Sequence, residues 1–418
     1  MKRAFVAAWL ACLPLVAAAD EALPGATVES LLEQARANPE YAAMLSESAA
    51  AADRVHPAGA LPDPVFRTEW QNFTNAGSER GPSLLPAQVG ATKYTVMQMF
   101  PLWGKRGLKR EVAEADVAQA QARAAATWAE IAAMVKSAFA RYYLAVRNEE
   151  ITREIVELMS RLERIASVRY ESGLVPQQDV IRAQVELTAM KSELLALEGE
   201  RDGLRAAINA LLAREPGAPL ATPVRLRPMP PPARIEPRAL ADRLRGRNPQ
   251  LFAEEARVTA AEKNRELTYR NRYPDVTAAI SPMQMGSRID SWELMLEVSI
   301  PLQQETRRRQ ESEARRMLEA AKQRKDAVGF RLVGELQENV AALQAAQRIE
   351  ILTATSLLPQ SEATLQSALA GYENGKVDFA TLLDAQRQIR KSRQDRLKAQ
   401  VEAQVRLAAI ERLLGEDL

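Results

Sequence analysis

The sequence is poor in the residues that catalysis and metal binding use most often. It holds one cysteine, Cys12, and one histidine, His56, in 418 residues. A single cysteine cannot form an intramolecular disulfide or a thiolate metal site. One histidine beside a proline is a poor candidate for the base of a Ser-His-Asp triad. With no glycine-rich phosphate-binding loop either, the sequence argues against an enzyme, a cofactor-dependent protein and a motor with its own energy source.

Excess charge of one sign and long apolar runs are also missing. Lys and Arg total 56 against 54 Asp and Glu, which gives a formal net charge of +2. A nucleic-acid partner would favour a basic face, so none is expected. Beyond the N-terminal region no stretch offers about 18 apolar residues free of charge, and we expect no membrane-spanning helix.

The N-terminus is typical of an exported protein. A basic pair, Lys2-Arg3, precedes the apolar run Ala4–Val16, and three alanines follow. This pattern predicts a secretory signal peptide over residues 1–19. Cys12 is not expected to carry lipid, because Trp9 stands where a lipidation signal needs leucine.

Two related segments organise the rest of the chain. RYESGLVPQQDVIRAQ, residues 169–184, returns as GYENGKVDFATLLDAQ, residues 371–386. Gly173 and Gly375 can take the positive φ that ends a helix, so each copy is predicted to be the tip of a helical hairpin. Further matches, such as Asn38-Pro39 with Asn248-Pro249, extend the duplication. We therefore expect repeat 1 over residues 20–213, a proline-rich linker over 214–237 and repeat 2 over 238–418.

Long segments of helical periodicity lead to each tip. Lys105 to Tyr170 predicts one helix about 100 Å long at 1.5 Å per residue. Its apolar residues keep helical and then heptad spacing, which is typical of coiled-coil packing. Thr306 to Tyr372 predicts the equivalent helix, kinked by Pro359. A shorter helix is expected in each repeat, from Val28 to about Val55 and from Arg238 to Tyr269.

Each repeat also contains two strand candidates. They are residues 65–73, 91–101, 276–282 and 291–300. In Ser291–Ile300 apolar and polar residues alternate strictly, which predicts one apolar and one polar face. The lengths suit transmembrane strands of about 9–11 residues, but a soluble sheet would alternate too. Since four strands cannot close a barrel, membrane strands would require several chains to share one.

The chain resembles the TolC-type outer-membrane efflux proteins. The resemblance rests on FPLWGKRGLKREVAEAD, residues 100–116, and on the two tip segments. It implies a mainly α fold with a small β part, in which a homotrimer completes a 12-stranded β-barrel among outer-membrane lipids and a periplasmic α-helical barrel. The implied function is a passive exit duct that meets a periplasmic adaptor (membrane fusion) protein and an inner-membrane resistance-nodulation-division pump. The first segment is similar to the heavy-metal branch, while organic compounds or polypeptides remain rival cargoes. A periplasmic coiled-coil scaffold or adaptor without a membrane part is the alternative.

The resemblance also implies a gate at the periplasmic tips. It places the gate aspartate at Asp179, its tyrosine partner at Tyr372 and an entrance-ring aspartate at Asp384. Two positions depart from the family pattern. Thr381 stands where the resemblance would place a second ring aspartate, and Val377 stands where it would place the gate arginine. Repeat symmetry sets Arg182 opposite Asp384, which makes Arg182 a candidate substitute cation, although a solvated helix-end residue is at least as good an interpretation. The adaptor-contacting tip residues would be Gly173, Leu174, Val175, Gly375 and Lys376.

Methionines are the one feature that could bind a metal. Thioether ligands suit Cu(I), and Met97 and Met99 would face the lumen if they share the face of Met295. Filling gaps between side chains is the commoner role of methionine, so no metal site and no cofactor are predicted.

Overall fold

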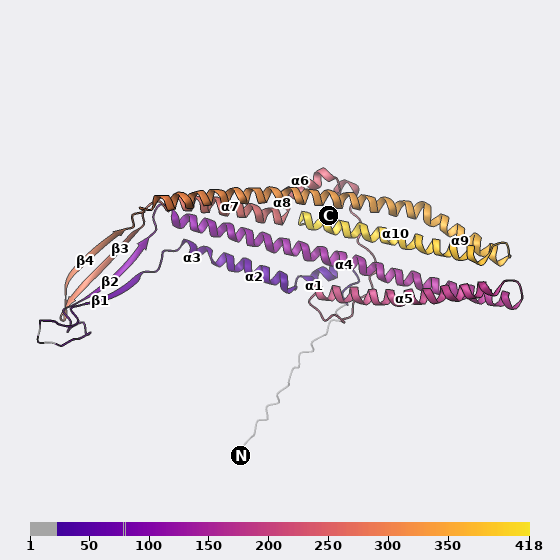
Figure 1. The fold of residues 1–418 in the computed structure, drawn as a ribbon, viewed down its shortest axis with the longest axis horizontal. Helices are drawn as coiled ribbons and strands as arrows, with labels where there is room; N and C mark the ends of the chain where they lie inside the picture. Colours follow the sequence, from indigo (N-terminus) through magenta and orange to yellow (C-terminus); the bar gives the residue numbers. More distant parts are fainter. Residues whose placement is uncertain (1–22, 78, 80) are drawn as a thin grey trace, which may run out of the picture.

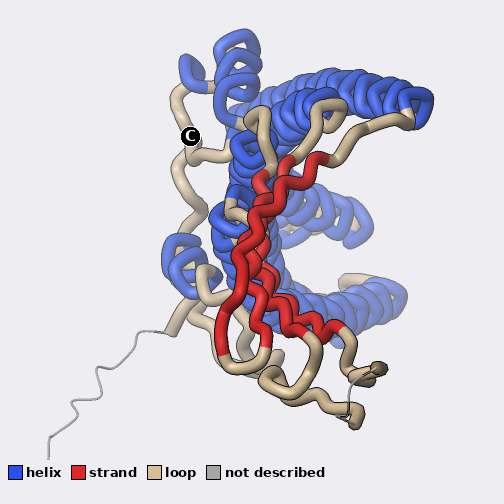
Figure 2. Tube along the Cα trace, turned by 90° about the vertical axis from the view of Figure 1, so that its left-hand side faces the viewer, coloured by secondary structure: helices blue, strands red, loops and turns tan. Residues whose placement is uncertain are grey.

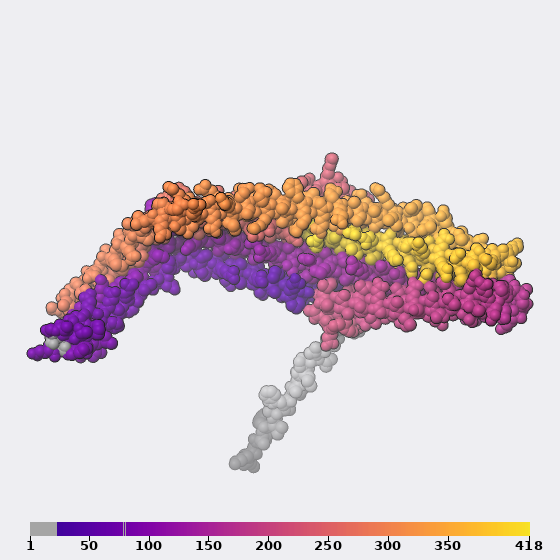
Figure 3. Space-filling view, viewed as in Figure 1, coloured from indigo at the N-terminus to yellow at the C-terminus, as the bar shows by residue number. Residues whose placement is uncertain are grey.

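The chain forms a long, curved rod with strands at one end and helical tips at the other (Figures 1 and 3). The computed structural model describes residues 23–77, 79 and 81–418. The expected signal peptide and Cys12 lie outside these residues. The predicted fold class, mainly helical with a small antiparallel sheet, is confirmed.

The sheet combines strands from both repeats. Its members are β1 (Val65–Gln71), β2 (Ala91–Phe100), β3 (Val276–Met285) and β4 (Arg288–Val298). They are antiparallel in the order β1-β2-β3-β4, so the repeats join through β2 and β3. β1 and β4 are the edge strands of the sheet, and each pairs with only one neighbouring strand. In Figure 2 the sheet stands across the end of the helical rod.

Two long hairpins run from the sheet to the tips. The first consists of α4 (Lys105–Glu171) and α5 (Gln177–Leu211). In the second, α8 (Gln304–Leu352) continues through η2 (Thr353–Leu357) into α9 (Leu358–Glu373), and α10 (Phe379–Leu414) returns. Gly173 and Gly375 have φ of 67° and 68°, which explains glycine at both turns.

Pro359 interrupts the second hairpin as predicted. The segment just before it, η2, is a turn of π-helix. Proline lacks an N–H and its ring crowds the carbonyl of the residue four positions earlier, here Thr355. Widening the preceding turn relieves that contact, and such bulges are a usual cause of helix kinks. α4 contains no equivalent break over its 67 residues.

The expectation of one short helix in each repeat was wrong. The first breaks into α1 (Val28–Ala35), α2 (Pro39–Asp53) and α3 (Val55–Gly59). The second breaks into α6 (Pro237–Arg247) and α7 (Pro249–Arg270), after the 3-10 turn η1 (Pro232–Arg234). The physical reason is the Asn-Pro pair. Proline occupies the first helical position, and the asparagine oxygen accepts a backbone N–H, from Glu40 at Asn38 and from Leu251 at Asn248.

The apolar core is divided along the rod. One cluster lies at the tips around Phe379, Leu382 and Met159. A second lies around Leu336, Leu343 and Ile410, where α6 packs on α8 and α10. A third joins α1 to α4 and α5 around Leu31 and Val135. The linker is tied to the N-terminal segment, because the amide of Ala221 donates to the carbonyl of Pro24 at 2.9 Å.

Candidate functional site

The four-stranded sheet has two faces of opposite character. The pairing register aligns Met97 with Ala279 and Ala279 with Met295, so alternate residues on every strand share a face. One face is mostly polar and carries Arg67, Glu69, Lys93, Thr95, Ser281, Glu293 and Glu297. The other is mostly apolar and carries Phe66, Trp70, Val96, Ile280, Trp292, Leu294, Leu296 and Val298. The alternation predicted for β4 thus extends across the whole sheet.

The apolar face is exposed on the single chain. Leu294 is 83% exposed, Leu296 is 68% exposed and Phe66 is 65% exposed. A continuous apolar face of this kind requires an apolar partner, such as lipid or another protein surface. A soluble scaffold sheet would bury these side chains in an internal core, so the alternative function is not favoured.

Some of the polar side chains on this face pair with one another. Lys93 on β2 forms an ion pair with Glu293 on β4, and the hydroxyls of Thr95 and Ser281 lie 2.9 Å apart. Met97, Met99 and Met295 do share this face, but Met97 and Met295 are two strands apart, at about 10 Å. No group of three or more His, Cys, Asp or Glu in the described part of the chain could hold a metal.

At the tips the two hairpins meet around Tyr372. This ring is 2% exposed and packs on Phe379 with centroids 5.4 Å apart. The guanidinium of Arg169, on α4, lies over the ring at 5.1 Å. Its Nη1 donates to the carbonyl oxygens of Tyr372 at 2.8 Å and Glu373 at 2.9 Å. Arg169 therefore supplies a cation beside Tyr372, whereas the resemblance placed the gate arginine at the position of Val377.

Sequence reasoning missed Arg169. It opens the first tip segment, and its counterpart in the second is Gly371. A Cβ at Gly371 would lie 2.5 Å from Cγ2 of Val377, so the second tip has no room for a side chain there. The change from arginine in the first tip segment to glycine in the second was the available signal.

Asp179 lies close to this cluster, and its pKa is shifted in the opposite direction from the pKa of the neighbouring Asp378. Burial raises the pKa of the Asp179 carboxyl, Arg182 acts against the rise, and Asp378 adds to it. Burial also raises the pKa of Tyr372, and the charge of Asp179 adds to that shift. Hydrogen bonds from Thr381 hold the pKa of Asp378 below its usual range, since Asp378 caps the start of α10. On acidification Asp179 therefore takes up its proton before Asp378.

The other predicted tip residues are distributed as follows. Arg182 and Asp384 line one groove between α5 and α10, but the cation beside Asp384 is Arg387, at 3.8 Å. Leu174, Gly375 and Lys376 are exposed at the ends of the hairpins, and Val175 is half-buried. Their roles as gate and adaptor-contacting residues stay predictions.

A titration tests the assignment of Asp179 as a gate residue. A raised pKa means that the charged carboxylate costs stability at neutral pH, and that this cost is lost as the pH falls through the raised value. If the protein conducts ions past the tips, wild type should lose cation preference at a pH above about 3.9, the usual aspartate value. Asp179→Asn should lack this step in reversal potentials recorded from pH 7 to pH 4. A step that persists in the variant would show that another group titrates.

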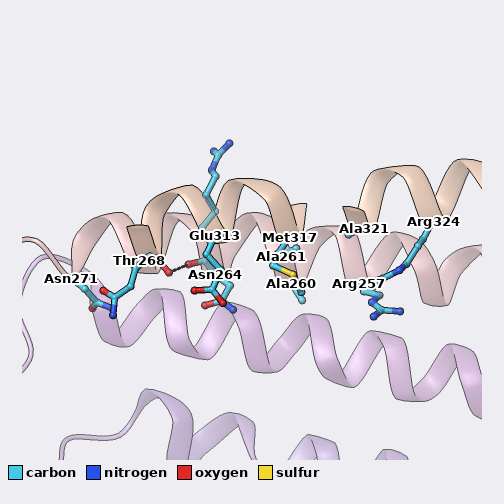
Figure 4. A pocket seen from close by; sticks show the side chains of 13 residues that line it. Arg257, Ala260, Ala261, Asn264, Thr268, Asn271, Glu313, Met317, Ala321 and Arg324 are labelled. Atoms are coloured by element: carbon cyan, nitrogen blue, oxygen red, sulfur yellow. Dashed lines mark hydrogen bonds between the residues drawn. The ribbon is translucent and has the colours of Figure 1, made fainter. Parts of the chain in front are cut away.

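The described helical surface also carries an open groove. A groove between α7 and α8 is lined by residues of mixed charge, including Arg257, Asn264, Glu313 and Arg324 (Figure 4). Pockets that bind small molecules are mostly apolar with few polar groups, and this open, charged groove is unlike them. None of the described helices is both long enough and apolar enough to span a membrane.

Known proteins share this architecture. The family model described as "Outer membrane efflux protein" matches residues 66–214 and 240–416. The cobalt-zinc-cadmium resistance protein CzcC of Cupriavidus metallidurans is 23% identical over 334 residues, 78% of each chain. The outer-membrane channel OprN is similar in structure, with a TM-score of 0.77, 20% identity and coverage of 93% of this chain and 89% of that one. The outer membrane protein VceC of Vibrio cholerae has a TM-score of 0.79 and 19% identity, with coverage of 93% and 96%.

The similarities to solved structures show the fold. The family model, in addition, matches residues in both repeats. Its two matched segments lie on either side of the proline-rich linker and together include all four strands apart from Val65. The chain as a whole therefore belongs to the outer membrane efflux protein family.

Proposed function

We propose that three copies of this chain form one passive channel through the outer membrane. The observation that carries the proposal is the two-faced sheet with a free edge on β1 and another on β4. An unpaired backbone group in hydrocarbon costs several kcal/mol, so these edges need partners. Pairing β4 of one copy with β1 of the next gives twelve strands from three copies of four, above the minimum of about eight for a membrane barrel.

In this assembly the apolar face meets lipid and the polar face lines the lumen. The long hairpins continue the lumen as a tunnel across the periplasm, and their tips narrow it. The exposed tip residues, among them Leu174 and Lys376, receive a periplasmic adaptor protein, which connects the channel to an inner-membrane pump of the resistance-nodulation-division class. The rod shape, with the sheet and the tips at opposite ends, supports this arrangement (Figure 1).

We propose divalent metal cations as the cargo class. The printed name of CzcC and the similarity of residues 100–116 to the heavy-metal branch support it. A lumen needs polar walls rather than a resident metal site to conduct hydrated ions. Cells that lack the protein should lose resistance to cobalt, zinc or cadmium if this class is correct.

Conductance of the purified protein in planar bilayers tests the channel directly. Stepwise insertion of ion-conducting units is expected. Asp384→Ala should reduce cation preference, because the Asp384 side chain is 79% exposed near the tips, and Asp179→Ala should act in the same direction. Glu319→Ala, on α8 far from the tips, is the matched control. Absence of conductance would refute the channel, and unchanged ion preference in both variants would refute the gate assignment.

A further inference from the structure

We propose that the end of the helical rod nearest the sheet carries a basic collar, which binds the anionic headgroups of phospholipids in the periplasmic leaflet of the outer membrane. The exposed part of the collar is Lys109 and Arg110 near the start of α4, together with Arg308 and Arg309 near the start of α8. The inference rests on the proposed function in one respect, that the sheet spans this membrane. It does not depend on the number of copies in the assembly or on the cargo.

Charge is distributed unevenly along a chain that is close to neutral overall. The four segments that connect the sheet to the helices, residues 55–64, 101–110, 270–275 and 299–309, contain nine lysines and arginines but only three aspartates and glutamates. Their net charge is therefore +6, whereas the whole chain has a net charge of +2. At the opposite end of the sheet, residues 72–90 and 286–290 contain two cations and two anions. The basic end of the sheet is thus the one that adjoins the helices.

Hydrogen bonds hold these four segments at one level of the rod (Figure 1). Nζ of Lys105 donates to Oδ1 of Asp275 at 2.8 Å, which joins the start of α4 to the segment before β3. Nε of Arg106 donates to the carbonyl of Gly59, at the end of α3, at 2.9 Å. Nη1 of Arg307 donates to the carbonyl that ends α7 at 2.5 Å, which joins α8 to α7. These three cations therefore stabilise the junction itself.

The remaining cations at the starts of α4 and α8 are exposed to solvent. Lys109 and Arg308 have no ion-pair or hydrogen-bond partner for their side chains among the described residues. Arg110 and Arg309 each pair with a glutamate four residues away on the same helix, at 2.8 Å and 2.9 Å. Exposed pairs of this kind are weak, so both guanidiniums remain available to another anion.

The spacing of the arginines on α8 lets them reach the outer side of the helical wall. Successive residues of a helix are about 100° apart around its axis, so Arg307, Arg308 and Arg309 together span about 200°. A cation therefore lies within about 80° of any direction around the start of α8. Arginine is also the side chain best suited to phosphate, because its planar guanidinium can donate two parallel hydrogen bonds to phosphate oxygens.

An apolar and aromatic band lies between the strands and the collar. Ile300 and Leu302, just after β4, are 72% and 81% exposed, and Trp103, just before α4, is 50% exposed. The Trp103 ring packs on Tyr273 with centroids 5.1 Å apart, and its Nε1 donates to the carbonyl of Pro274 at 3.0 Å. Tryptophan and tyrosine concentrate where hydrocarbon meets the headgroups. This band is therefore the expected boundary of the hydrocarbon, and the collar follows it directly.

The height of the collar agrees with the thickness of a headgroup layer. Lys105 to Arg110 spans about 8 Å at 1.5 Å per residue, and the headgroups of one leaflet occupy roughly 5–8 Å. Cations at this depth raise the affinity for anionic lipid about fivefold each. The collar thus combines the position and the charge that an anionic phospholipid requires.

The first test measures which lipid stays bound to the purified protein. Wild type in detergent is incubated with equal amounts of phosphatidylglycerol, which is anionic, and phosphatidylcholine, which has no net charge. Native mass spectrometry then counts the retained lipids. Wild type should retain phosphatidylglycerol in about fivefold excess, and Lys109→Gln/Arg110→Gln/Arg308→Gln/Arg309→Gln should retain the two lipids equally. Equal retention by wild type, or an undiminished excess in the variant, would overturn the proposal.

The matched control removes the same charge from the same two helices far from the sheet. It carries four changes at exposed positions, Arg161→Gln, Arg164→Gln, Arg331→Gln and Arg348→Gln. The control should keep the wild-type excess of phosphatidylglycerol. If it loses the excess as well, only the total charge of the protein matters and the collar is not a binding surface.

A smaller variant covers the case in which the fourfold collar variant does not assemble. Lys109→Gln/Arg308→Gln breaks no ion pair with the described residues, so its assembly should match wild type. It should still lower the excess of phosphatidylglycerol at least twofold. An unchanged excess in this assembled variant would contradict a role for the collar.

Vesicles separate this inference from the proposed function. Wild type should insert into vesicles of phosphatidylcholine alone and into vesicles that also contain phosphatidylglycerol. Insertion into neither would refute the membrane location, whereas insertion into both with equal lipid retention would refute the collar alone. Inorganic phosphate at the concentration of the lipid should not displace phosphatidylglycerol, because phosphate makes no apolar contact with the band around Trp103. Displacement by phosphate would show a general anion site in place of a lipid-binding surface.

Discussion

Replacing Leu294 with lysine should prevent the protein from accumulating as an assembled channel in the outer membrane. Leu294 lies in the middle of β4 on the apolar face. A lysine facing lipid near the middle of the bilayer costs about 2–4 kcal/mol per copy, and every copy in the assembly carries it. The assembled form should therefore be absent from membrane fractions, as judged by its migration in gels before and after heating.

Met295→Lys is the matched control for that experiment. It changes the next residue on the same strand but places the charge on the polar face. Assembly should stay at the wild-type level, with a shift toward anion preference in bilayer recordings. If both variants assemble equally well, the apolar face does not contact lipid.

Glu411→Ala should cause a large loss of stability in the helical part. The Glu411 side chain is 2% exposed and accepts hydrogen bonds from Lys136 Nζ at 2.7 Å and Arg227 Nη2 at 2.9 Å. Its other oxygen accepts the amide of Leu418 at 2.9 Å. Removing the carboxylate leaves two cations beside each other in a sheltered site, which costs about 3–5 kcal/mol. A lower urea midpoint in tryptophan fluorescence, with an unchanged slope, is the expected result.

Asp417→Ala provides the comparison. Asp417 also pairs with Lys136, but its side chain is 72% exposed. Exposed ion pairs contribute about 0–1 kcal/mol, so the midpoint should hardly move. An equal loss in the two variants would mean that burial of Glu411 is not what makes its pairs important.

The sequence predicted the features that depend on residues close together along the chain. Alternation along Ser291–Ile300 gave the two faces of β4, Gly173 and Gly375 marked the tips, and Pro359 marked the break in the second hairpin. The helix breaks at Asn38-Pro39 and Asn248-Pro249 were also local, yet these pairs were used to find the duplication and not as helix starts. Lysine and glutamate at positions 136 and 411 are 275 residues apart, and nothing in either local sequence indicates that they meet.

The gate was the part of the site that the sequence predicted least well. Arg182 and Asp384 were matched by repeat symmetry, and they do line one groove, but the cation beside Asp384 is Arg387 on its own helix. The contact of Arg169 with the end of α9 depends on how two hairpins pack, which periodicity within either one does not specify.

The exposed apolar face of the sheet has a consequence for biogenesis. Before insertion, each newly exported copy would present Phe66, Trp292 and Leu294 to water, together with two strand edges ready to pair with any other chain. Aggregation then competes with delivery to the membrane, and the helical rod offers no cover for this surface. We therefore expect an exported copy to need a holding factor in transit that shields these strands until they are inserted.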